Sequence, residues 1–301
     1  MTPRKIPYNK SYLSIEDQII QLQSRGMQFA NVDNAKHYLL HMNYYRLTAY
    51  WLPYEQDHTT HRFRVNTSFE KVLKYYVFDR ELRLLMLDAI ERVEVSVRTQ
   101  MAHTLSNAYG THPHMNSSIF NSQERYTNNL NKLKGEFSRS SETFSDHFKE
   151  KYIEELPPIW VAVELMTMGH ISHWYSNIKQ RSDKNAISRI YGLDESILKS
   201  FLHHLTIIRN ICAHHGRLWN RRFTFAIRMP NYPTDLAQSV NRSNVDIKSL
   251  YNTLVFLKYL MDTINPGHQW AIRLKELLDS NDINIAAMGF PLNWETLPVW
   301  Q

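Results

Sequence analysis

The sequence is poor in cysteine, glycine and proline. Its 301 residues include one cysteine, Cys212, which excludes a disulfide framework and fits a reducing compartment. Glycine (8) and proline (11) are together about half as frequent as in average proteins, which argues against a turn-rich all-β fold. A mostly helical protein is therefore expected.

Long apolar runs are also missing. The most apolar stretch, residues 159–171, carries Glu164 and His170 and is too short to cross a bilayer. Residues 1–7 contain no apolar segment, so no signal peptide is expected. We therefore expect a cytoplasmic protein that does not contact a membrane.

The charge balance is mildly basic. Lysine and arginine number 35 against 29 acidic residues, so the formal net charge is +6, which favours a polyanionic partner. The 15 histidines make acid–base chemistry near neutral pH available, without showing that it occurs.

Apolar residues recur every three or four positions along most of the chain, as in amphipathic helices. The clearest stripe, within residues 69–105, predicts one helix of about 30 residues. Ser14 and Asp17 resemble a capping box, and Asp194 is placed to cap a helix that runs to Cys212. The alternation within residues 55–67 predicts a short hairpin or loop.

These patterns predict an all-α fold in two parts. We expect an N-terminal helical, aromatic-rich region at 1–68 and a helical core at 69–301. Within the core, residues of about 110–150 are polar and are interpreted as an insertion or mobile connection with short helical pieces. The aromatic tail, residues 288–301, is expected to lie across the helical body.

Polar, ionisable residues appear abruptly at the end of the apolar helix that follows Asp194. Asn210 and His214 are one helical turn apart and share a face, and Arg209 is long enough to reach them. These three are the candidate catalytic residues. The structural alternative is a helix C-terminus whose cations suit the helix dipole.

Such a set suits RNA cleavage without a metal. A histidine can take the proton of a ribose 2′-hydroxyl or protonate the leaving 5′-oxygen, and a guanidinium can hold the charge of the transition state. One histidine cannot be acid and base in the same step, so a homodimer with two facing copies is expected. The need for a 2′-hydroxyl makes RNA the expected substrate.

Three further groups are secondary candidates. His215 is a neighbour of the site or a second catalytic group. Arg98 and His103 repeat the spacing of Arg209 and His214 and form either a second half-site or a solvated helix face. Basic and aromatic residues that could bind phosphates and stack on bases, or belong to the core, follow the motif: Arg217, Trp219, Arg221 and Arg222.

A zinc site is a weaker reading of the same segment. The potential ligands are His203, His204, Cys212, His214 and His215. They lack the repeated pair spacing of zinc sites and point in several directions around one helix. No glycine-rich phosphate loop is present. Neither a metal nor another cofactor is therefore expected.

Several motifs resemble one known family. Arg209-Asn210 followed by His214 resembles the motif of the HEPN superfamily of helical ribonucleases. The wider string at 209–221 is similar to the Abi-like abortive-infection proteins (AbiD/AbiF). Further segments resemble the signatures of that family in the same order, and the match weakens at 110–145; these segments are 43–54, 78–98, 158–166 and 288–294.

The resemblance implies a HEPN-type helical bundle and a toxin of phage defence that halts growth by cleaving RNA. It implies a metal-independent endoribonuclease with Arg209 and His214 in catalysis and Asn210 as an orienting group. Because some relatives work with a small noncoding RNA, such an RNA is a further candidate partner. Two alternatives stay open: a non-catalytic RNA-binding or sensing protein, and a toxin silenced by a partner.

Overall fold

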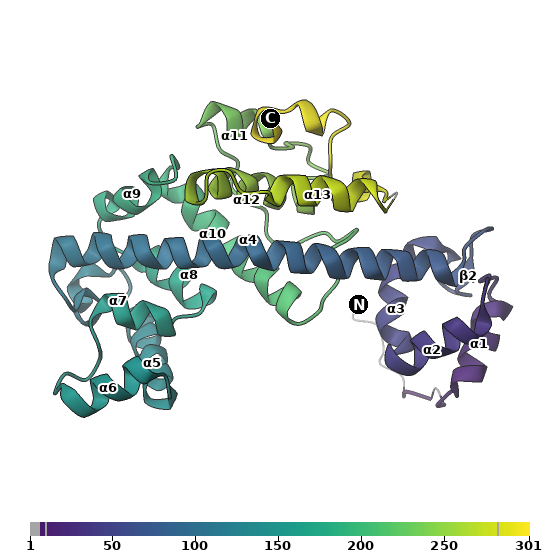
Figure 1. Ribbon diagram of the computed structural model, residues 1–301, viewed down its shortest axis with the longest axis horizontal. Helices are drawn as coiled ribbons and strands as arrows, with labels where there is room; N and C mark the ends of the chain where they lie inside the picture. The colour runs from purple at the N-terminus through teal and green to yellow at the C-terminus, as the bar shows by residue number, and fades with distance from the viewer. Residues whose placement is uncertain (1–6, 10, 282) are drawn as a thin grey trace. The chain divides into compact units, whose positions relative to one another are not determined.

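The structure is a computed structural model that describes residues 7–9, 11–281 and 283–301, and it is essentially all-α (Figure 1). The predicted fold class is confirmed. The chain divides into two compact units, Met1–Arg80 and Glu81–Gln301. The predicted boundary at residue 68 coincides with the start of a long helix, whereas the division between the units lies inside that helix.

The first unit is a small helical assembly with one hairpin. Its elements are α1 (Ile15–Ser24), α2 (Val32–His41), α3 (Tyr44–Trp51), η1 (Leu52–Tyr54), β1 (Glu55–Asp57) and β2 (Arg62–Phe63). Ser14 caps α1 by accepting from the backbone N–H of Asp17, and the antiparallel pairing of β1 with β2 confirms the predicted hairpin. The buried Tyr50 hydroxyl donates to Asp79 Oδ2 at 2.7 Å, which ties α3 to the following helix.

That helix, α4 (Phe69–Tyr109), has 41 residues and is longer than predicted. Its sequence contains neither glycine nor proline, so no residue favours an end before Gly110. Gly110 has a φ of +85°, the left-handed conformation that commonly follows a helix C-terminus.

Residues 110–150, predicted as a polar insertion or mobile connection with short helical pieces, form defined helical elements in the second unit. They are η2 (Pro113–Met115), η3 (Ser117–Ile119), α5 (Gln123–Arg139) and α6 (Thr143–Lys151). Although α5 is rich in asparagine, Tyr126, Leu133 and Phe137 give it a buried stripe at helical spacing. This stripe is what a count of polar residues overlooks.

The middle of the second unit is organised around one amphipathic helix, α10, whose apolar face is buried. The elements are α7 (Ile159–Ala162), η4 (Val163–Leu165), α8 (Met168–Asn177), α9 (Arg181–Arg189) and α10 (Glu195–Ala213). The apolar stretch from residue 159 does not form one continuous helix, because Thr167 caps a new helix, α8. Asp194 caps α10 as predicted. Helix α10 packs against α8 and α9.

The C-terminal part covers the second unit. It contains α11 (Thr234–Ser239), α12 (Leu250–Ile264), α13 (Trp270–Asp279), η5 (Ile285–Met288), η6 (Trp294–Thr296) and η7 (Pro298–Trp300). Trp270 Nε1 donates to the carbonyl of Leu85 at 2.8 Å, so α13 is fixed to the Glu81–Tyr109 part of α4. The tail packs on α11 and α12, with Trp300 Nε1 donating to the Tyr251 hydroxyl at 3.1 Å. Its predicted position across the body is confirmed.

Candidate functional site

The candidate site lies at the C-terminal end of α10, which closes with two hydrogen bonds. The N–H of His215 donates to the carbonyl of Cys212 at 3.0 Å, and that of Gly216 donates to Ile211 at 2.7 Å. This pair of bonds is the Schellman motif, in which glycine usually takes the left-handed position. Here His215 takes it, with a φ of +57°. A side chain in that conformation costs roughly 1 kcal/mol, and such costs are concentrated at functional sites.

Close approach favours glycine one residue later, at Gly216. A Cβ there would lie 3.0 Å from Ile211 Cγ2 and 3.2 Å from the carbonyl oxygen of Ile211. The carbonyl of Gly216 in turn accepts from Arg83 Nη1 of α4 at 3.3 Å. The turn that carries the histidines is therefore held on both α10 and α4.

The predicted catalytic residues are divided between two environments. Asn210 and His214 are exposed, and the N–H of His214 donates to the carbonyl of Asn210 at 3.0 Å, so the two lie one turn apart on one open face. Arg209 is half-buried, and its positive charge opposes the rise that burial causes in the pKa of Glu94 of α4, so the two groups lie within range of an electrostatic interaction.

Glu94 was not among the candidates from the sequence. Its side chain is 13% exposed and accepts a hydrogen bond from Arg98. Burial raises the pKa of Glu94, and the positive charges of Arg98 and Arg209 oppose that rise. The carboxyl group therefore lies near two guanidinium groups, one from α4 and one from α10. The four-residue spacing to Arg98 indicates one of these pairs, but the approach of Arg209 depends on tertiary packing.

The two members of the second pair, Arg98 and His103, lie in different environments. Besides Glu94, Arg98 donates to the carbonyl of Met166 and lies 3.7 Å from Glu164 Oε2. The side chain is 15% exposed and joins α4 to η4 and the residue after it. His103 lies on an exposed face of α4. The guanidinium of Arg98 is thus engaged in hydrogen bonds and ion pairs within the fold.

The four predicted RNA-binding residues after the motif are not equally accessible. Trp219 is 2% exposed, so in this structure its ring belongs to the core. Arg217 and Arg221 are half-buried, and Arg221 Nη1 donates to the carbonyl of Arg217 at 3.3 Å. Arg222 is the exposed member of the four.

The residues considered as zinc ligands also lie in different environments. His204 is 2% exposed, and its ring nitrogens lie 3.1 Å from the carbonyl of Phe225 and 2.8 Å from Thr253 Oγ1. Burial lowers the pKa of His204 to about 4, so the ring is neutral at pH 7 and joins α10 to α12. Cys212 is buried, and His203 is exposed. Among the described residues, no three His, Cys, Asp or Glu side chains gather as a metal site would require.

Comparison with known families decides the wider identity. A family model described as Abi-like protein matches residues 37–220, which is more than half of the chain and includes Arg209 and His214. The chain belongs to the Abi-like family. This confirms the predicted resemblance to the Abi-like proteins, and the matched segment runs through the end of α10 to Asn220, just past Gly216.

Other comparisons add no relatives. Neither a curated protein nor a solved structure matches the chain. Over residues 7–9, 11–281 and 283–301, every helix is too short or too polar to span a bilayer.

Proposed function

We propose that this protein acts in abortive infection as a metal-independent endoribonuclease of the HEPN type. Membership of the Abi-like family supports the role in abortive infection. The chemistry is carried by one observation: Asn210 and His214 share an exposed face at a helix end closed by hydrogen bonds, beside a half-buried Arg209. A titratable group, an amide and a permanent cation at one place suit attack on a phosphodiester.

The proposed reaction is transfer of the phosphoryl group within the RNA. The ribose 2′-oxygen attacks phosphorus while the bond to the 5′-oxygen breaks, giving a 2′,3′-cyclic phosphate and a 5′-hydroxyl. His214 of one copy takes the 2′-hydroxyl proton, and the same histidine of a second copy protonates the 5′-oxygen. Arg209 stabilises the added negative charge, and Asn210 orients the imidazole or a phosphate oxygen. The proposed active unit is therefore a homodimer.

Cleavage of end-labelled RNA in excess EDTA tests the assignment. Wild type is expected to cut and to leave 2′,3′-cyclic phosphates, whereas His214→Ala and Arg209→Ala are expected to lose at least about 100-fold in rate. His147→Ala, which removes an exposed histidine from α6, is the matched control and should cut normally. Loss of wild-type cutting in EDTA would refute the metal-independent mechanism. If wild type and all variants bind RNA but none cleaves it, the result would favour a non-catalytic RNA-sensing protein or a toxin silenced by a partner.

His103→Ala distinguishes the two arginine–histidine pairs. Normal cleavage by this variant, from a dimer in sedimentation, assigns the reaction to Arg209 and His214 of two copies. A catalytically active monomer that loses activity with His103→Ala would instead place the second half-site on α4.

A further inference from the structure

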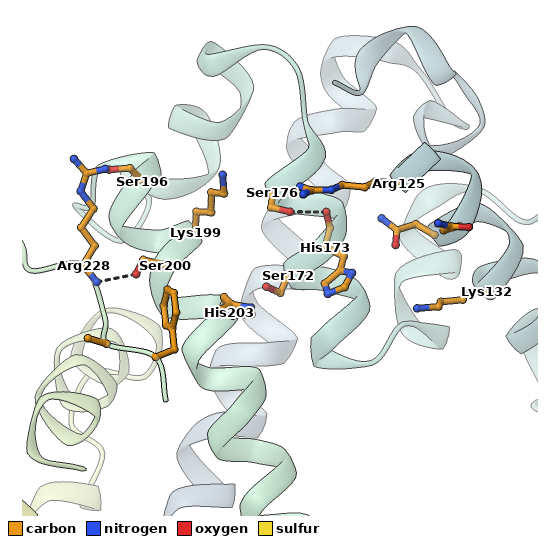
Figure 2. Close-up of a pocket in the computed structure, with 14 residues that line it drawn as sticks. Arg125, Lys132, Ser172, His173, Ser176, Ser196, Lys199, Ser200, His203 and Arg228 are labelled. Carbon is orange, nitrogen blue, oxygen red and sulfur yellow. Dashed lines mark hydrogen bonds between the residues drawn. The ribbon is translucent and has the colours of Figure 1, made fainter. Parts of the chain in front are cut away.

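A second feature of the Glu81–Gln301 unit is a cleft bounded by α5, α8, α10 and the segment 225–228. Its volume is about 780 Å³, within the range of small-ligand sites. We call it the cationic cleft and define it by Arg125, Lys132, Lys199, Arg228, His173 and His203. Figure 2 shows Lys199 and Arg228 on one side, Arg125 and Lys132 on the other, and the histidines between them.

The charge of this cleft is of one sign. No aspartate or glutamate is among its described lining residues, and within the described chain none of its four lysines and arginines forms an ion pair. Burial lowers the pKa of His173, and the positive charges of Lys132, His203 and Arg125 lower it further. The side chains therefore repel one another and favour an anion between them.

An unpaired donor in the wall points to the same ligand. Asn129 is 3% exposed and lines the cleft, and its Nδ2 has no hydrogen-bond partner among the residues that the structure describes. Leaving a buried amide donor unpaired costs about 1–3 kcal/mol, which an oxygen of a bound phosphate would offset. Phe225, at the other wall, is 36% exposed and meets His203 edge to face at 4.7 Å, so it offers a ring to a base.

The cationic cleft and the end of α10 lie along one stripe of that helix. Lys199, His203, Asn210 and His214 are exposed and fall within roughly 60° of one another at 100° per residue. From His203 to His214 the helix rises about 16 Å, a length that a few nucleotides of an extended strand can span. A strand with phosphates in the cleft can therefore follow the stripe to His214.

We infer that the cationic cleft binds single-stranded RNA a few nucleotides from the bond that is cut, holding phosphates between α5 and α10 and a base against Phe225. The inference rests on the proposed function in one respect: that function places the bond to be cut at His214, so that the strand runs from the cleft toward this residue. The binding itself requires no cleavage. It assigns substrate recognition to residues on α5, α8 and α10, in addition to the basic segment after the motif.

The binding test uses full-length His214→Ala protein, so that the RNA stays intact, and a fluorescein-labelled RNA of mixed sequence. In anisotropy titrations over a salt series, log K decreases with log salt, and the magnitude of this slope should fall by about 0.7 for each phosphate that the protein no longer neutralises. Arg125→Gln and Lys199→Gln should each reduce the magnitude by that amount, and the double variant by about twice as much. Arg189→Gln, an exposed arginine of α9 outside the cleft, is the matched control and should leave the slope unchanged.

Competition identifies the form of the ligand. RNA oligonucleotides should displace the labelled strand far better than a mononucleotide or inorganic phosphate. Equal competition by the mononucleotide would overturn the assignment to an RNA strand. Unchanged affinity and slope in both cleft variants would overturn the site. If wild type binds RNA through the cleft but never cuts it, the proposed nuclease fails and the cleft stands.

With His214 intact, the same variants give a second readout. If the cleft binds substrate away from the reacting atoms, Arg125→Gln and Lys199→Gln should raise KM and leave kcat close to that of wild type. A fall in kcat with unchanged KM would contradict a binding role for these residues.

Discussion

Replacing His204 with glutamine should make the protein less sensitive to mild acid. His204 is neutral in the folded protein, with a pKa of about 4 against an ordinary value of 6.5, because burial disfavours its charged form. Below pH 6.5 the unfolded chain therefore binds a proton that the folded chain does not. Stability is lost as the pH falls from about 6.5, and the loss is complete below about 4.

The size of the effect follows from these two pKa values. Proton linkage gives a loss of about 2 kcal/mol from His204 between pH 7 and pH 5, and a limit of about 3 kcal/mol below pH 4. Glutamine does not titrate in this range and keeps a donor for the carbonyl of Phe225. The variant is expected to lose about 1–3 kcal/mol at pH 7 through imperfect hydrogen bonding, and then to lose less than wild type on acidification.

The assay is urea unfolding at pH 7 and pH 5, comparing the difference between the two pH values for each protein. Carboxyl groups contribute equally to both proteins, so the comparison isolates the histidine. His114→Gln is a parallel case, because burial also lowers the pKa of His114 to about 4 and its side chain is 1% exposed. An equal pH dependence in wild type and His204→Gln would refute the argument that His204 stays neutral.

Two further substitutions probe the end of α10. Glu94→Gln removes the charge near Arg98 and Arg209. We expect this variant to lose about 1–3 kcal/mol of unfolding free energy and to have a several-fold lower kcat. An unchanged kcat would show that Glu94 does not position Arg209. Gly216→Ala introduces a Cβ 3.0 Å from Ile211 Cγ2, so thermal unfolding should show about 1 kcal/mol of destabilisation with reduced cleavage, whereas full stability would mean that the turn relaxes.

The helical fold was predictable because its signals are local. Caps at Ser14 and Asp194 and the apolar stripe of α4 are each visible within a few turns of sequence, and each is present in the structure. The interruption after α7 was not predicted, since the apolar pattern continues through it and only the cap at Thr167 marks the new helix. Helix α5 is longer than the short helical pieces that were predicted, because its few apolar residues are diluted by polar ones.

The candidate site was predictable in part, for the same reason. Asn210 and His214 share a helical face by spacing alone, and the structure places both on an exposed face. The approach of Arg209 to Glu94, the left-handed His215 and the burial of Trp219 depend on how distant segments pack. The cationic cleft draws its residues from α5, α8, α10 and the segment 225–228, so no single stretch of sequence displays it.

Helix α10 contributes to both the cationic cleft and the candidate site at His214. Its two faces differ in burial and composition. Its apolar face, with residues such as Phe201, Leu205 and Ile208, is buried, which fixes the helix in the core. Its exposed face carries Lys199, His203 and His214. His204, at the border of the two faces, contacts the carbonyl of Phe225 and so helps to fix that wall of the cationic cleft. A strand bound along the exposed face would therefore be positioned by a helix whose opposite face is buried in the core. The distance along α10 between the cationic cleft and His214 would then fix which phosphodiester bond of the bound strand reaches His214. A substitution in the cleft would therefore alter which bond is cut as well as how tightly RNA binds.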